Sequence, residues 1–122
     1  MIYGIDAFTI SDIMEILKDP KKAKLTKESK QKILQSQQNV QQIVASDRTV
    51  YGINTGFGPL CDVKISEEET AQLQHNLIIS HAVGVGKPIA KELSKVMMIS
   101  KIHALSKGFS GVSLEVIERL IF

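Results

Sequence analysis

The segment TVYGINTGFGPL, residues 49–60, interrupts a chain of 122 residues whose other segments show mostly helical patterns. It places three glycines and one proline around a single tyrosine, Tyr51. Glycine loses more backbone freedom on folding than any other residue, so the cluster indicates unusual turns or close backbone approach to a ligand. The residues alone leave two interpretations: a turn whose tyrosine packs on the core, or a loop that presents a phenol to a ligand.

The composition indicates a soluble globular protein without a nucleic-acid partner. Apolar residues make up 43% and charged residues 23% of the chain, and 15 basic against 13 acidic residues leave a net charge of only +2. Seven lysines lie between Lys18 and Lys32. Because no aromatic residues interleave for base stacking, this run favours a solvated surface over an anion-binding patch.

The remaining composition predicts a reducing, cytoplasmic setting and no membrane association. The single cysteine, Cys61, has no partner for an internal disulfide and is interpreted as a small buried hydrophobe rather than a nucleophile. The first ten residues, MIYGIDAFTI, lack the basic region of a signal peptide. No apolar run has the length of a bilayer span.

Hydrophobic periodicity and capping residues predict a mainly α fold with a minor β component. A short strand is expected within residues 2–10. The helices and their N-caps are expected at residues 12–19 after Ser11, 27–46 after Thr26, 67–81 after Ser66, 88–107, and 114–122 after Ser113. The fourth of these, with VMMISKIHAL at its centre, is apolar on almost every side and is predicted to be buried, with Gly108 as its C-terminal cap.

The end of the chain indicates truncation. The last predicted helix stops at Phe122 with its apolar stripe of Leu114, Ile117, Leu120 and Ile121 still running. We therefore expect residues 1–122 to be a single N-terminal domain of a longer protein, with this final helix cut off.

Two further motifs do not support a site. GVGKP, residues 84–88, ends like a phosphate-binding loop but has His81 where the first glycine belongs and Pro88 where Ser or Thr belongs. The histidines His75, His81 and His103 share no metal-ligand spacing, so no metal site is predicted.

Three motifs in order carry a family resemblance. YGINTGFG (51–58), LQHNLIISHAVGVGKP (73–88) and ALSKGFSGV (104–112) resemble successive blocks of the aromatic amino acid ammonia-lyases and aminomutases. The resemblance covers most of the chain after residue 45. It implies the helical fold of the fumarase/aspartase-like superfamily, of which this chain would be the N-terminal domain.

The resemblance also implies a reaction and a prosthetic group. Family members remove ammonia from an α-amino acid and a proton from its β-carbon, using a methylidene-imidazolone (4-methylidene-imidazol-5-one, MIO) that forms from an internal Ala-Ser-Gly. These 122 residues contain no Ala-Ser-Gly, so the group is expected to come from a C-terminal part, and the fragment is expected to be inactive alone. The resemblance further implies that the full-length protein is a homotetramer.

Four residues match positions with roles in the family. Tyr51 matches the catalytic base, although a phenol, with a pKa of about 10, acts as a base only where its surroundings favour the phenolate. Gly58 matches a glycine that leaves room for substrate. Ser80 and His81 match the pair that meets the substrate side chain, and this Ser-His pair is most like that of histidine ammonia-lyases.

Several alternatives remain open from the sequence. Some tyrosine-selective members also carry Ser-His, an aminomutase would use the same loop, and a non-catalytic helical domain could bind a partner through its unfinished apolar face. Two positions depart from many members: Ser113 stands where arginine is common and His103 where asparagine is common. Neither position is among the four residues assigned to the site.

Overall fold

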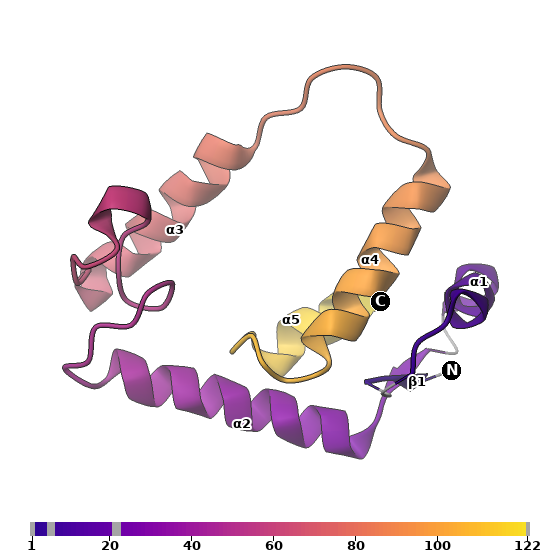
Figure 1. The fold of residues 1–122 in the computed structure, drawn as a ribbon, viewed down its shortest axis with the longest axis horizontal. Helices are drawn as coiled ribbons and strands as arrows, with labels where there is room; N and C mark the ends of the chain where they lie inside the picture. Colours follow the sequence, from indigo (N-terminus) through magenta and orange to yellow (C-terminus); the bar gives the residue numbers. More distant parts are fainter. Residues whose placement is uncertain (1, 5–6, 21–22, 122) are drawn as a thin grey trace. The chain divides into compact units, whose positions relative to one another are not determined.

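A computed structural model describes residues 2–4, 7–20 and 23–121, with only the backbone described for residues 60, 67, 68 and 70. The described chain is mainly helical (Figure 1). Its elements are β1 (Ile2–Tyr3), α1 (Ile10–Lys18), β2 (Lys24–Leu25), α2 (Lys27–Val44), the 3₁₀ turn η2 (Gly58–Leu60), α3 (Glu67–His81), α4 (Lys91–Leu105) and α5 (Leu114–Ile121). The predicted mainly α class with a minor β component is confirmed.

The contacts within the chain group into two compact units. The first contains residues 1–39 and 88–122, and the second contains residues 40–87. The first holds the hydrophobic core, and the second holds the glycine-rich loop and α3. The expectation of a single domain spanning residues 1–122 stays a prediction.

The β structure is smaller than expected. β1 covers Ile2 and Tyr3 alone and pairs in parallel with β2, which the sequence did not predict. Part of the predicted strand, residues 5 and 6, lies outside the described residues, and residues 7–9 are irregular.

The first helix begins earlier than predicted, because Thr9 rather than Ser11 is its N-cap. The Thr9 hydroxyl accepts from the amide of Asp12 (3.2 Å), and the Asp12 carboxylate accepts from the amide of Thr9 (2.7 Å). This reciprocal capping box needs an acidic or amide side chain three residues after the cap. Ser11 has Met14 at that position, so Thr9 is the better cap.

The caps predicted for three later helices are confirmed. The hydroxyls of Thr26, Ser66 and Ser113 accept from the backbone amides of Ser29 (2.8 Å), Glu69 (3.2 Å) and Val116 (3.3 Å). Helix α3 has the predicted bounds, whereas α2 ends at Val44 and α4 spans residues 91–105, both shorter than predicted. These differences of two or three residues lie at helix ends. At the end of α2, for example, the Ser46 hydroxyl donates a hydrogen bond to the carbonyl of Ile43 (2.8 Å).

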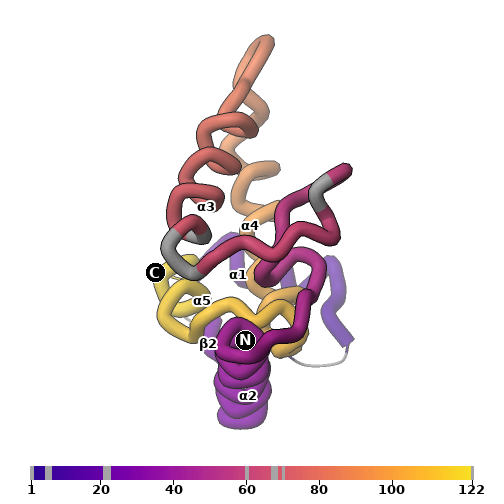
Figure 2. The backbone as a smooth tube through the Cα atoms, turned by 90° about the vertical axis from the view of Figure 1, so that its left-hand side faces the viewer, coloured from indigo at the N-terminus to yellow at the C-terminus, as the bar shows by residue number. Residues whose placement is uncertain are grey.

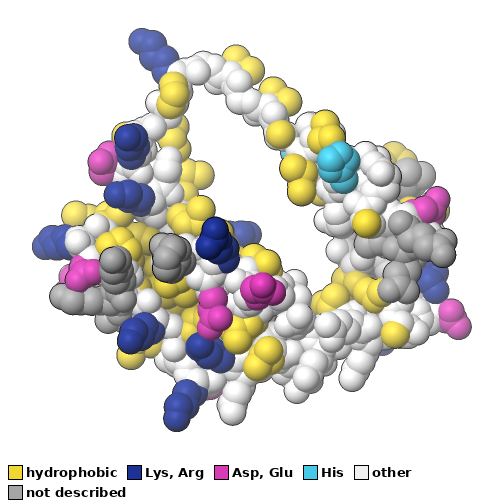
Figure 3. All heavy atoms as spheres, turned by 180° about the vertical axis from the view of Figure 1, so that it is seen from behind, with side chains coloured by type: hydrophobic (Ala, Val, Ile, Leu, Met, Phe, Trp, Pro, Cys, Tyr) yellow, Lys and Arg dark blue, Asp and Glu magenta, His cyan; other side chains and the backbone are white. Residues whose placement is uncertain are grey.

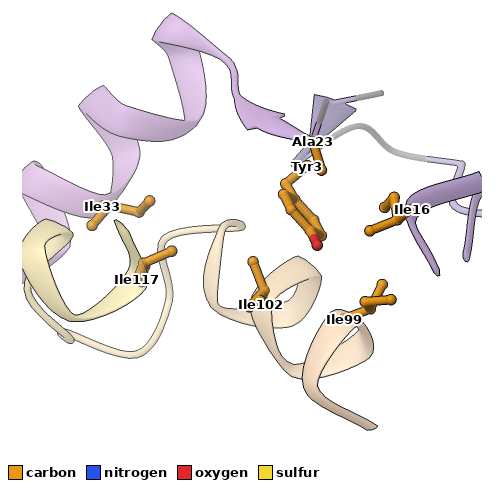
Figure 4. Packing of buried hydrophobic residues seen from close by; sticks show 7 residues of the cluster. All are labelled: Tyr3, Ile16, Ala23, Ile33, Ile99, Ile102 and Ile117. Carbon is orange, nitrogen blue, oxygen red and sulfur yellow. The ribbon is translucent and has the colours of Figure 1, made fainter. Parts of the chain in front are cut away.

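The core of the first unit draws side chains from several elements. Figure 4 shows these side chains pointing toward one another from α1, α2, α4, α5, β1 and the residue just before β2. Its buried members are Tyr3, Ile16, Ala23, Ile33, Ile99, Ile102 and Ile117. The predicted stripe of α5 is confirmed, since Ile117 is fully buried and Leu114, Leu120 and Ile121 pack against the cluster.

Helix α4 is not buried on all sides, which corrects the prediction. Ile99 and Ile102 enter the core, but Met97 is 63% exposed and Met98 is also exposed. A helix that packs one face on a small core leaves its other apolar side chains in solvent, however many of them it carries. The connection at residues 82–90 is likewise exposed, including Val83, Val85 and Ile89, and hydrophobic side chains lie along it on the face drawn in Figure 3.

After α4, the chain turns at Gly108 directly against α2. Gly108 has φ +76°, a conformation that side chains rarely adopt, and a Cβ there would lie 2.7 Å from the carbonyl carbon of Lys32. The C-cap residue is Ser106, and Gly108 makes the turn two residues later. Glycine is therefore required here both by the backbone angle and by the close approach of α2.

Candidate active site

The tyrosine predicted as a base lies at the tip of a hydrogen-bonded turn. The amides of Ile53 and Asn54 both donate to the carbonyl of Val50 (3.1 and 3.3 Å), so the chain reverses around Tyr51 and Gly52. Gly52 has φ +79°, which glycine adopts without strain. The Tyr51 side chain is 63% exposed, and its ring meets the edge of Phe57 with centroids 6.0 Å apart. The phenol is therefore presented to solvent rather than packed in a core.

Two polar side chains that sequence reasoning missed lie beneath this turn. Asn54 is 5% exposed and Thr55 is 2% exposed. The side-chain amide of Asn54 accepts a hydrogen bond from the backbone N–H of Val50 (2.8 Å) and donates one to the backbone carbonyl of Arg48 (2.8 Å). An Asn next to glycines is itself a turn signal, because its side chain commonly bonds nearby backbone, and this signal could have identified it.

The turn is joined to the segment that leads into α3. The amide of Gly56 donates to the backbone carbonyl of Val63 (3.2 Å), and the amide of Ile65 donates to the backbone carbonyl of Asn54 (3.0 Å). Between these two hydrogen bonds, Thr55 forms an antiparallel bridge with Lys64. Ser66, the next residue, caps α3. In Figure 2 this region is the magenta tube that leaves α2, makes several tight turns and enters α3. The loop is thus anchored at the N-terminal end of α3.

Lys64 closes the base of the same loop. Its ammonium lies 3.4 Å from the Asp47 carboxylate and 3.5 Å from the carbonyl of Ser46. Both groups are at the surface, so this ion pair contributes little to stability. It connects the residues just before the loop with those just after it.

Gly58 opens the short turn η2 with Pro59 behind it. Its φ is +59°, and apart from its two chain neighbours no described heavy atom lies within 4 Å of the position that a Cβ would occupy. Glycine is therefore required by the backbone angle and not by packing within the second unit. The side of Gly58 that a side chain would fill is open.

Ser80 and His81 are neighbours at the C-terminal end of α3. The Ser80 hydroxyl donates to the carbonyl of Leu77 (3.0 Å), and the Nδ1 atom of His81 lies 2.8 Å from the same carbonyl and 3.1 Å from the Ser80 hydroxyl. A carbonyl oxygen only accepts, so Nδ1 carries the proton in this contact. In the neutral ring, Nε2 is then an acceptor, and both side chains are exposed.

The four predicted site residues belong to two segments of the second unit. The Tyr51 loop is anchored at the first turn of α3, whereas Ser80 and His81 form its last turn, and a helix of 15 residues is about 22 Å long. Within residues 40–87 as described, no hydrogen bond or ring contact joins Tyr51 or Gly58 to Ser80 or His81.

Other candidate chemistry finds no support in the described part of the chain. No cluster of three or more His, Cys, Asp or Glu side chains there has the geometry to hold a metal ion. Two lysines of the lysine-rich segment form ion pairs at the surface, Lys30 with Glu118 (2.6 Å) and Lys32 with Glu28 (2.7 Å). Over the same residues, no helix combines the length and apolarity needed to cross a membrane.

Comparison with known proteins identifies the family. The family described as aromatic amino acid lyase matches residues 8–122. The chain is 44% identical to a histidine ammonia-lyase of Bacillus subtilis over 115 residues, which cover 94% of this chain and 23% of that protein. It therefore spans about a quarter of the length of such a relative.

Solved structures agree with this assignment. The histidine ammonia-lyase of Trypanosoma cruzi superposes with a TM-score of 0.83 at 30% identity, over 98% of this chain and 23% of that one. A tyrosine aminomutase from Streptomyces globisporus superposes with a TM-score of 0.88 at 24% identity, over 99% and 23% of the two chains, and so shares the fold. The chain thus belongs to the aromatic amino acid lyase family, and its fold is that of the ammonia-lyases and aminomutases.

Proposed function

We propose that this chain supplies the base-bearing loop and the substrate-selecting pair of an ammonia-lyase that converts L-histidine to trans-urocanate and ammonia. The observation that carries the proposal is the 44% identity to a histidine ammonia-lyase over 94% of the chain. The exposed, anchored Tyr51 and the adjacent Ser80–His81 pair support it, because they provide the groups that the reaction needs.

Tyr51 is the proposed general base. The β-proton of an amino acid is weakly acidic, so its removal requires a base held at the reacting carbon. The Tyr51 side chain is exposed, and the open side of Gly58 leaves room in the same loop for a ligand. The phenolate oxygen would accept the β-proton, while ammonia leaves from the neighbouring carbon.

His81 is the proposed selector for an imidazole side chain. With Nδ1 bonded to the Leu77 carbonyl, its Nε2 atom is left as a hydrogen-bond acceptor on an exposed side chain. A substrate imidazole N–H is a suitable donor. A phenyl ring offers no donor and would leave this acceptor unpaired, which disfavours phenylalanine.

A methylidene-imidazolone (MIO), formed from an Ala-Ser-Gly outside these 122 residues, is the proposed prosthetic group. The residues described here fit such a group, because Tyr51 is exposed and the space beside Gly58 is open. When bound, the group supplies the electrophile that captures the substrate amine and makes ammonia a better leaving group. The 122-residue chain alone is therefore expected to be inactive.

A homo-oligomer, which by family resemblance is a homotetramer, completes the proposed site. The Tyr51 loop is attached near the N-terminal end of α3 and the Ser80–His81 pair lies at its C-terminal end, and in this proposal different copies bring the two groups to one substrate. We propose a cytoplasmic enzyme whose partners are its own copies and an amino acid substrate, with no nucleic acid and no membrane.

The test is turnover by the full gene product that contains this chain, with histidine, tyrosine and phenylalanine as separate substrates. Absorbance of the unsaturated acid reports elimination, and chromatography of the amino acid pool reports a β-amino acid. Histidine is expected to give the highest kcat/KM. Faster turnover of tyrosine would correct the substrate, a β-amino acid product would identify an aminomutase, and no product from any of the three would refute the lyase.

A further inference from the structure

Two buried polar side chains, Asn54 and Thr55, directly follow the turn that carries Tyr51. They are 5% and 2% exposed, whereas Tyr51, Gly52 and Phe57 of the same loop are exposed. A buried polar group is costly unless it is hydrogen-bonded. Both groups find their partners in the backbone on either side of Tyr51.

Asn54 holds the segment before Tyr51. Its Oδ1 accepts from the amide of Val50 (2.8 Å), and its Nδ2 donates to the carbonyl of Arg48 (2.8 Å). An oxygen facing an N–H and a nitrogen facing a carbonyl fix the orientation of the side-chain amide. The residue immediately before the tyrosine therefore has its amide bonded to a buried side chain.

Thr55 holds the segment after Tyr51. Its hydroxyl accepts from the amide of Gly52 (3.3 Å) and donates to the carbonyl of Gly56 (2.9 Å). Gly52 is a glycine with positive φ, and its backbone would otherwise sample many conformations. One hydroxyl thus connects the glycine after Tyr51 with Gly56, whose amide in turn donates to the carbonyl of Val63 in the segment that leads to α3.

The Tyr51 ring has little to hold it apart from this backbone. It is largely exposed, and its ring contact among the described residues is the edge of Phe57, with centroids 6.0 Å apart. The location of the phenol oxygen is therefore determined mainly by the backbone at residues 50–52. That backbone is held by Asn54 on one side and by Thr55 on the other.

We propose that Asn54 and Thr55 are positioning residues that hold Tyr51 where it can remove the substrate proton. The inference rests on the proposed function for its catalytic part, whereas the tether itself can be tested without activity. A misplacement of about 1 Å at a reacting group can lower turnover about 100-fold. Loss of either tether is therefore expected to lower kcat more than it affects substrate binding.

The experiment compares variants of the full gene product. Thr55→Val removes the hydroxyl but keeps the shape, and Thr55→Ser keeps the hydroxyl and serves as the conservative rescue. Thr49→Val makes the same chemical change at an exposed position two residues before Tyr51. Asn54→Ala tests the other tether independently. Each variant is assayed at a temperature below the midpoint of its thermal unfolding, and kcat is calculated from the concentration of folded protein.

Two readouts separate the tether from catalysis. Hydrogen–deuterium exchange of a peptide that begins at residue 48 or earlier and ends at residue 57 reports the amides of Val50 and Gly52. Thr55→Val and Asn54→Ala are expected to increase exchange in this peptide about tenfold and to lower kcat about 10- to 100-fold with KM changed less than about threefold. Thr55→Ser and Thr49→Val are expected to stay near the parent protein in both readouts.

The contrary outcomes are distinct. Unchanged exchange in Thr55→Val and Asn54→Ala would overturn the tether. Faster exchange with unchanged kcat, or a rise in KM alone, would overturn the positioning role while leaving the tether. If the parent protein turns over no amino acid, the proposed function fails, and the exchange data alone then decide whether the tether exists.

Discussion

The imidazole of His103 lies face to face with the ring of Phe8, with ring centroids 4.0 Å apart and planes 8° from parallel. The contact joins α4 to the segment just before α1. The Nδ1 atom of His103 is buried and has no hydrogen-bond partner among the described residues. Burial, aided by the nearby Lys107 ammonium, lowers the pKa of His103, and the Asp12 carboxylate only partly opposes this effect.

This arrangement predicts a loss of stability at mildly acidic pH. A histidine whose pKa is lowered in the folded state binds a proton more readily when unfolded, so acidification below the ordinary pKa of about 6.5 favours unfolding. The free energy of unfolding, measured by urea titration, is expected to fall as the pH drops from about 7.5 to about 5.5. The slope should flatten in His103→Gln but not in His75→Gln, which changes an exposed histidine of α3. Equal slopes in both variants would contradict the assignment.

Asp12 affects a separate and lower pH range. Hydrogen bonds from the hydroxyl and amide of Thr9 lower the pKa of Asp12, so the stability that it contributes is present above about pH 4 and is lost as the pH falls through its folded pKa. His103 changes the free energy of unfolding at higher pH, so the contributions of the two residues can be measured separately.

Removing the hydroxyl group of Tyr51 tests its role as a base. Tyr51→Phe in the full gene product is expected to lower kcat at least about 100-fold, the usual minimum contribution of a positioned base. Tyr3→Phe makes the same change at the buried tyrosine of the core and is expected to leave kcat unaltered. Product absorbance with histidine measures both. A Tyr51→Phe enzyme within threefold of the parent would remove Tyr51 from the mechanism.

Mixing two inactive variants tests whether different copies share one site. Tyr51→Phe and His81→Ala proteins, co-expressed, are expected to regain up to about a quarter of the parent kcat/KM, because random assembly leaves that share of sites with both native residues. Co-expressed Tyr51→Phe and Tyr51→Ala proteins provide the control, since no site can regain the phenol. Failure to recover activity from a mixed oligomer would indicate that one chain supplies both groups.

Truncating a core side chain tests the packing of α5. Ile117 is fully buried among the core residues, so Ile117→Ala is expected to lower the free energy of unfolding by about 3 kcal/mol. Val116→Ala, one position along on the exposed side of the same helix, is expected to change it by less than about 0.5 kcal/mol. Similar losses in the two variants would mean that α5 does not pack as described.

The sequence predicted helices well where the pattern is local. Ser66 with Glu69 gave the start of α3, and Ser113 gave the start of α5, because an N-cap is decided by residues three positions apart. It predicted a strand where β1 lies but missed β2 and the pairing of the two strands, which joins residues about twenty positions apart. The sequence also wrongly predicted that α4 is buried on almost every side, because burial depends on which elements pack against a helix and not on its apolar content alone.

The residues of the candidate site were chosen from sequence motifs, and their roles stay predictions. Three motifs in order pointed to Tyr51, Gly58, Ser80 and His81, whereas their spacing did not show which ends of α3 carry the loop and the Ser-His pair. Asn54 and Thr55 were missed because the same letters also fit an ordinary turn. Only the three-dimensional structure shows that their side chains bond the backbone on both sides of Tyr51.

The length of α3 also bears on how such an enzyme could change its preference. The group that would recognise the substrate ring sits at one terminus of the helix, and the loop that would perform the chemistry is fastened to the other. A substitution at residue 80 or 81 leaves every hydrogen bond of the Tyr51 loop in place. Selectivity can therefore be altered by evolution, or by an engineer, without rebuilding the catalytic apparatus.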